Sequence, residues 1–276
     1  LNDILKNTSG STFPNLSREN LDSFKFNLPK DLNINSINNF LSLLDSKIEL
    51  NNKINKELES MAKTLYDYWF VQFDFPNENG KPYKSSGGKM VYNQELKREI
   101  PEGWEVNNLE EICEIYQPQT ISEKEMMKDG KYFVFGANGI VGMYDKYNHE
   151  DSEVTITCRG NSCGTLNRTL PYSWITGNAM VIKFKEHKIH NEYLMHFLSW
   201  TKMDNVITGS AQPQITRTNL SPLKILIPET NILDNFSQKM EFNVNFQLKN
   251  IEQNQELAKL RDWLLPMLMN GQVSVK

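Results

Sequence analysis

Apolar residues recur at spacings of three and four between positions 37 and 68. This is the period of a helix that buries one stripe, so we predict a helix over residues 37–70. The stripe has the form of a coiled-coil seam in which Asn51 is the one polar member. The apolar seam residues are Ile37, Leu41, Leu44, Ile48, Ile54, Leu58, Met61, Leu65 and Tyr68.

A second helical period covers residues 233–265, and its seam is less regular. Its apolar candidates are Phe236, Met240, Val244, Ile251 and Ala258, with Asn243, Gln247 and Asn254 between them. Seam amides specify register at some cost in stability. One such helix would ordinarily pack on its own globular domain, but two matched helices are natural partners. We therefore predict an antiparallel coiled coil that acts as a spacer.

The residues between the two helices change to β-branched and aromatic runs separated by glycines. We predict strands over residues 132–135, 154–157 and 179–182, and a helix over 191–203. The fold class is therefore α+β, with a mixed α/β globular unit and two long helices.

The expected organisation has five segments. Turn residues such as Pro76, Gly80 and the Ser-Ser-Gly-Gly run at 85–88 favour loops over regular elements in the connector. The segments are the tail of a preceding unit at 1–30, the first helix at 31–70, the connector at 71–100, the globular unit at 101–230 and the second helix at 231–268.

An internal repeat supports this division. Residues 10–21 (GSTFPNLSRENL) align with residues 209–220 (GSAQPQITRTNL), each 199 positions after its counterpart. The alignment continues through 24–29 and 223–228, each of which reads as a short strand closed by proline. We therefore expect the chain to be the C-terminal portion of a two-unit protein, with only the second unit complete.

Composition narrows the function classes. A hydrophobic fraction of 39% is that of a folded protein, and no apolar run approaches the roughly 18 residues of a membrane span. Three cysteines argue against a secreted disulfide framework and favour a reducing, cytoplasmic compartment. The net charge of −4 does not favour nucleic acid, whose binders usually have a pI above about 9.

No motif predicts catalysis. The chain has no Asn-Pro-Pro-aromatic or Asp-Pro-Pro-aromatic tetrapeptide of amino-methyltransferases and no glycine-rich phosphate loop. Cys158, Cys163 and His149 lack the second ligand pair of a zinc site, so we interpret the cysteines as structural thiols. We expect no enzyme activity, no cofactor and no metal.

Polar loops carry the candidate binding chemistry. Residues 157–168 form a glycine-bounded turn between strands that presents arginine and asparagine side chains. Arginine reads guanine bidentately, and asparagine or glutamine reads adenine. The alternative is that these side chains bond only local backbone. On a locally basic face, the candidate DNA contacts are Gln117, Gln119, Lys131, Asn138, Lys146, Arg159, Asn161, Arg168, Gln212, Gln214 and Arg217.

Several short motifs, in order along nearly the whole chain, resemble those of one family. They are FPNENGKPYKSSGGKM at 75–90, REIPEGW at 98–104, GANG at 136–139, CRG at 158–160, GNAM at 177–180 and QPQI at 212–215 followed by Ile227-Pro228. With the repeat, this arrangement resembles the DNA specificity (S) subunit of type I restriction–modification systems.

The resemblance implies that each target recognition domain reads half of a bipartite site in double-stranded DNA. It implies that the helices fix the gap between the half-sites and dock the methyltransferase (M) subunits, with Ile48, Leu58, Leu65, Met240 and Ile251 as our candidate docking residues. Methylation and cleavage would belong to the M and restriction (R) subunits, and S-adenosylmethionine would bind M. The competing hypothesis is a non-catalytic protein-binding scaffold with a helical spacer, which the net acidity favours.

Overall fold

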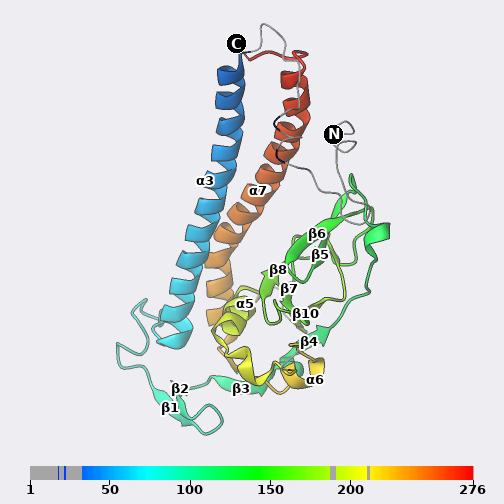
Figure 1. Ribbon diagram of the computed structural model, residues 1–276. Helices are drawn as coiled ribbons and strands as arrows, with labels where there is room; N and C mark the ends of the chain where they lie inside the picture. Colours follow the sequence, from blue (N-terminus) through cyan, green and yellow to red (C-terminus); the bar gives the residue numbers. More distant parts are fainter. Residues whose placement is uncertain (1–17, 19–21, 23–32, 187–190, 210–211, 276) are drawn as a thin grey trace. The chain divides into compact units, whose positions relative to one another are not determined.

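The computed structural model describes residues 18, 22, 33–186, 191–209 and 212–275, which form two compact units (Figure 1). The helical unit contains the described residues up to Lys53 and those from Asn250 onward, and the mixed unit spans Ile54–Lys249. The first copy of the repeat and the predicted tail at 1–30 lie outside the described residues, apart from positions 18 and 22. None of the described helices is long and apolar enough to cross a membrane.

Both predicted long helices are present, with different ends. Helix α3 spans Ile34–Tyr66 and continues into a π-helical turn at Asp67–Val71, and α7 spans Thr230–Met269. Asn33 caps α3, because its Oδ1 accepts the Ser36 N–H at 3.1 Å. Pro266 lies in the last turn of α7, which continues to Met269. The proline has no N–H to donate, so it removes one backbone hydrogen bond near the end of the helix without ending the helix there.

In the helical unit, the two helix segments run antiparallel, as predicted. Arg261 Nη1 lies 2.8 Å from Asp45 Oδ1, and Asn51 Nδ2 donates to Asn254 Oδ1 at 2.8 Å and to Gln253 Oε1 at 2.9 Å. Asn51 is fully buried. At the polar seam position, a buried amide of α3 therefore bonds to the half-buried Asn254 and the exposed Gln253 of α7.

In the mixed unit, the adjoining helix segments also pair, and side-chain burial contradicts the seam prediction at Met61 and Tyr68, which are exposed, and the docking prediction at Met240. Gln247 Nε2 donates to the Asn55 carbonyl at 3.2 Å. Met61 is 62% exposed, and its neighbour Ala62 is buried instead. Met240 lies inside the core, so its side chain does not face a partner. The other candidate docking residues, Ile48, Leu58, Leu65 and Ile251, are half-buried.

The described residues of the mixed unit form four small sheets, and the strands predicted at 132–135, 154–157, 179–182 and 223–228 are found, whereas the one predicted at 24–29 lies outside the described residues. The four-stranded sheet has the order β4-β10-β7-β8, and the three-stranded sheet has the order β6-β5-β9. Their strands are β4 (Cys113–Tyr116), β5 (Tyr132–Gly136), β6 (Gly139–Tyr144), β7 (Val154–Thr157), β8 (Leu166–Arg168), β9 (Trp174–Ile175) and β10 (Ala179–Phe184). Strand β3 (Glu105–Asn108) pairs antiparallel with β11 (Lys224–Ile227).

The prediction of an irregular connector is wrong at its C-terminal end. Strands β1 (Met90–Asn93) and β2 (Arg98–Pro101) form an antiparallel hairpin that starts inside residues 71–100. Strands of four residues are too short for their alternation to stand out. The shorter helices are α4 (Leu109–Ile112), α5 (Asn191–Trp200) and α6 (Arg217–Leu220), with 3-10 turns at Glu123–Glu125 and Met203–Asn205.

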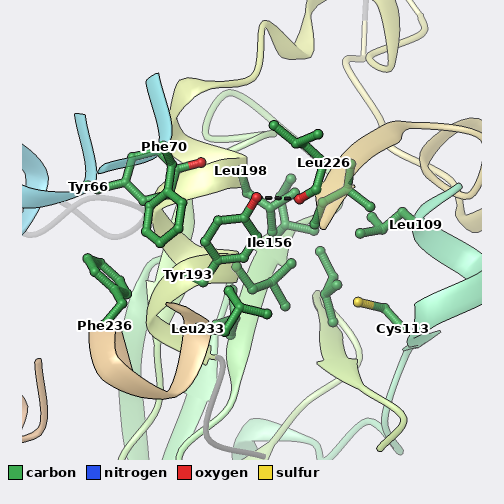
Figure 2. Close-up of a cluster of buried hydrophobic side chains, with 14 of the residues drawn as sticks. Tyr66, Phe70, Leu109, Cys113, Ile156, Tyr193, Leu198, Leu226, Leu233 and Phe236 are labelled. Carbon is green, nitrogen blue, oxygen red and sulfur yellow. Dashed lines mark hydrogen bonds between the residues drawn. The ribbon is translucent and has the colours of Figure 1, made fainter. Parts of the chain in front are cut away.

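An aromatic core attaches the helix segments of the mixed unit to its sheets (Figure 2). The Phe70 ring lies 4.8 Å from that of Tyr193 and 4.9 Å from that of Phe236, measured between centroids. The buried Tyr193 hydroxyl donates to the Leu226 carbonyl, so its polar atom is satisfied. Residues from the π-helical turn after α3, from α5, from α7 and from β11 therefore share one core.

Candidate nucleic-acid interface

The turn between β7 and β8 presents two of the predicted contacts. Backbone bonds close it, from Gly164 N to Thr157 O and from Thr157 N to Thr165 O, both at 2.9 Å. Gly160 and Gly164 have φ of +86° and +90°, a conformation that side-chain-bearing residues rarely adopt. The glycines therefore allow a tight turn whose exposed residues include Arg159 and Asn161.

A second loop lies beside this turn. Gly160 N donates to Pro213 O at 3.1 Å, and Ile215 N donates to Cys158 O at 2.9 Å. Ile215 is buried and anchors the segment in the core. Two pieces of chain separated by about fifty residues are thus held together by backbone hydrogen bonds.

An open groove with a volume of about 570 Å³ lies between the turn and the loop. Four predicted contacts line it together with a glycine and a proline: Arg159, Asn161, Gln212 and Gln214, with Gly160 and Pro213. Within the part of the chain that the structure describes, no carboxylate pairs with Arg159. Its guanidinium and the neighbouring amides are therefore available to a ligand with hydrogen-bonding edges.

Two further predicted contacts border the same region. The tip of the β5–β6 hairpin carries Asn138, and its Ala137 carbonyl accepts from Thr157 Oγ1 and from Asn167 Nδ2. Gln117 Nε2 donates to the Gly177 carbonyl at 3.1 Å, and its side chain also bonds the Cys158 thiol. Both side chains are exposed, and that of Gln117 is partly used in holding the loops together.

Four other predicted contacts do not line the groove: Lys131, Lys146, Gln119 and Arg217. Lys131 and Lys146 flank the open end of the β5–β6 hairpin, about 13 Å along the strands from its tip. The Lys131 ammonium lies 5.1 Å from the centre of the Tyr132 ring. Gln119 is exposed in the loop after β4, and Arg217 is exposed at the start of α6.

The structure corrects the assignment of Arg168. Its guanidinium forms an ion pair with Glu192 on α5, and the two side chains are only 18% and 12% exposed. Burial raises the pKa of Glu192 against the opposing effect of Arg168. Arg168 therefore joins β8 to α5 and is not a surface contact for DNA.

The cysteines and His149, considered above for metal binding, have contacts inside the fold. Burial raises the pKa of the Cys158 and Cys163 thiols, which disfavours the thiolate that a metal needs. His149 is buried, with Nε2 2.9 Å from the Tyr116 hydroxyl, and burial lowers its pKa to about 4. Among the described residues, no group of three potential ligands has the arrangement of a metal site.

Sequence reasoning missed Thr208, which holds Gln214 in place. Thr208 N donates to Gln214 O at 2.9 Å, and Gln214 N donates to Thr208 O at 2.8 Å. The one local signal is Gly209, with φ of +87° and too little space for a Cβ beside the Gln212 carbonyl. A glycine marks the turn but does not identify the residue that pairs across it.

Comparisons with known proteins agree on one family. The family model described as "Type I restriction modification DNA specificity domain" matches residues 1–60 and 101–260. The MjaIX specificity subunit of Methanocaldococcus jannaschii is 24% identical over all of this chain and 67% of its own length. The HindI specificity subunit of Haemophilus influenzae is 22% identical over 98% of this chain and 73% of its own length.

A solved structure has the same fold. The S subunit of a type I restriction–modification system from M. genitalium has a TM-score of 0.57 and 16% identity to this chain. The alignment covers 98% of this chain and 69% of that one.

Proposed function

Because the chain belongs to the family of type I restriction–modification DNA specificity domains, we propose that it reads one half of a bipartite site in double-stranded DNA. The observation that carries this proposal is the groove lined by Arg159, Asn161, Gln212 and Gln214. Its side chains offer the donors and acceptors that distinguish base edges in the major groove. They stand on turns fixed by backbone hydrogen bonds, so little order must be gained on binding.

Phosphate contacts are expected to come largely from other subunits. They usually dominate the affinity of a protein for DNA, and this chain has a net charge of −4. In this proposal, the chain supplies sequence discrimination and the M subunits supply much of the electrostatic attraction.

The long helices are the proposed docking surface for the M subunits. In the helical unit, Leu43 and Trp263 are exposed, and Trp263 is 57% accessible. In the mixed unit, Phe242 and Phe246 stack with centroids 6.0 Å apart, and Phe242 is 72% accessible. Large apolar groups on the surface favour a protein partner.

The predicted seam residues have a different part in this proposal. Ile48, Leu58, Leu65 and Ile251 are half-buried, so they support the helix pair while the exposed residues make the contact. The helices act as the spacer between recognition domains, and R subunits join the assembly that cleaves. Methylation and cleavage are assigned to M and R, not to this chain.

The test is expression of the chain with the M subunits of its own restriction–modification system, followed by sequencing of methylated adenines. We expect a complex and methylation at a bipartite motif that disappears when the chain is omitted. Failure to form a complex would contradict the proposal. Complex formation without any sequence preference would favour the protein-binding scaffold instead.

A further inference from the structure

The backbone pairs Arg159 directly with Gln214 in an antiparallel bridge. The bonds that make this bridge belong to the flanking residues, from Gly160 N to Pro213 O and from Ile215 N to Cys158 O. Arg159 and Gln214 are therefore a non-hydrogen-bonded pair. In such pairs the Cα atoms are about 4.5 Å apart and the two side chains emerge close together on one face.

Gln214 is held on its other edge as well. Both of its backbone groups bond to Thr208, and the next residue, Ile215, is buried. The side chain of Gln214 thus starts from a backbone position that is fixed on two sides. The bridge to Gln214 also restrains the backbone of Arg159.

Both side chains are exposed in the groove, and their chemistry is complementary to two different bases. The arginine fork matches the O6 and N7 acceptors of guanine, and the glutamine amide matches N6 and N7 of adenine. Base pairs stack about 3.4 Å apart. Two long side chains that start about 4.5 Å apart can therefore reach consecutive base pairs without crossing.

We propose that Arg159 and Gln214 act as one unit that reads a guanine and an adenine in consecutive base pairs of the half-site. This inference rests on the proposed function and names the specificity of its groove. The bridge makes the two readings interdependent, because neither backbone segment can move without the other. Asn161 and Gln212 also line the groove, but no described backbone bridge couples their side chains in this way.

The experiment selects duplexes from a randomised library with the full chain in complex with its M subunits and sequences the bound DNA. We expect the wild-type motif to contain guanine and adenine at neighbouring positions. Arg159→Ala should lower the preference for guanine by about 5- to 150-fold, and Gln214→Ala should do the same for adenine. The double variant should lose less than the product of the two single losses, since each reading depends on the other.

Two further variants separate base reading from charge and from loss of folding. Arg159→Lys keeps the positive charge but loses the planar guanidinium that can donate two parallel hydrogen bonds to guanine. The preference for guanine should therefore fall, while the salt dependence of binding stays unchanged. Gln94→Ala, an exposed glutamine in the β1–β2 turn, is the matched control and should keep the full motif. Thermal unfolding of each variant reports whether the loops remain folded.

The outcomes distinguish this inference from the proposed function. A wild-type complex without sequence preference would overturn both. A wild-type complex with a clear motif that Arg159→Ala and Gln214→Ala leave intact would overturn only the assignment of these two residues. A motif with guanine and adenine at separated positions would overturn the coupled reading.

Discussion

Substitution of Glu192 by glutamine isolates a buried positive charge, because it removes the counter-ion of Arg168 and changes little in volume. The two side chains are 18% and 12% exposed, so solvent screens them weakly. The Nε atom of Arg168 is already buried without a hydrogen-bond partner among the described residues. Glu192→Gln would leave the guanidinium with a neutral amide in place of a carboxylate.

The expected loss is a large part of the stability of the chain. Removing one member of a buried ion pair costs about 3–5 kcal/mol, because the remaining charge has no compensation for its lost hydration. Whole domains are stable by only about 5–15 kcal/mol. The Glu192→Gln chain should therefore unfold at a clearly lower urea concentration with an unchanged urea dependence.

The matched control is Glu95→Gln, which breaks the ion pair with Lys224 between half-exposed side chains. Exposed pairs contribute about 0–1 kcal/mol, so this variant should unfold close to wild type. A paired replacement, Arg168→Met with Glu192→Leu, should recover much of the loss, since both charges are then absent. Equal urea midpoints for Glu192→Gln and Glu95→Gln would refute the reasoning.

A buried histidine, the amides between the helices and an exposed phenylalanine pair give three other predictions. Burial lowers the pKa of His196 to about 4, so this side chain binds its proton in the unfolded chain but not in the native state below pH 6.5; His196 should lower stability by about 1.4 kcal/mol per pH unit between pH 6.5 and 4, in addition to a like contribution from His149. Urea titrations of wild type and His196→Phe at pH 7 and pH 5 check this, and an equal pH dependence in both would contradict it. Asn51→Ala removes the donor to Asn254 Oδ1 and Gln253 Oε1, while Asn254 Nδ2 keeps its bond to Asn52 Oδ1; it should cost about 1–3 kcal/mol by urea titration, and a neutral effect would show that these bonds contribute nothing. Phe242→Glu with Phe246→Glu should abolish co-purification with M subunits without lowering the unfolding temperature, and retained co-purification would exclude this face as the docking site.

Local pattern was enough to predict the main elements of the fold. The helical period predicted α3 and α7 to within four residues at each end, and the strands at 132–135, 154–157 and 179–182 were all found. The amide at Asn51 was correctly predicted at the polar seam position. The hairpin of β1 and β2 was missed because strands of four residues give too short an alternation.

Side-chain environment was the part that pattern could not supply. Arg168 and Arg159 both lie in the same polar segment, and local sequence treats them alike. Only the packing of α5 against β8 brings Glu192 to Arg168, while Arg159 stays exposed on the turn. Met61 and Ala62 are a similar case, because the helical period suits either residue and only the packed core shows that Ala62 is buried and Met61 exposed.

The amino-acid sequence by itself determined the periods of the helices and strands, the repeat and the supply of amide and arginine side chains in the loops. These properties depend on residues close together in the chain, or on a comparison of the chain with itself. The tertiary structure alone decided which of those side chains meet. The bridge between Arg159 and Gln214 joins residues 55 positions apart, and it exists because two loops on one core expose complementary backbone groups to each other.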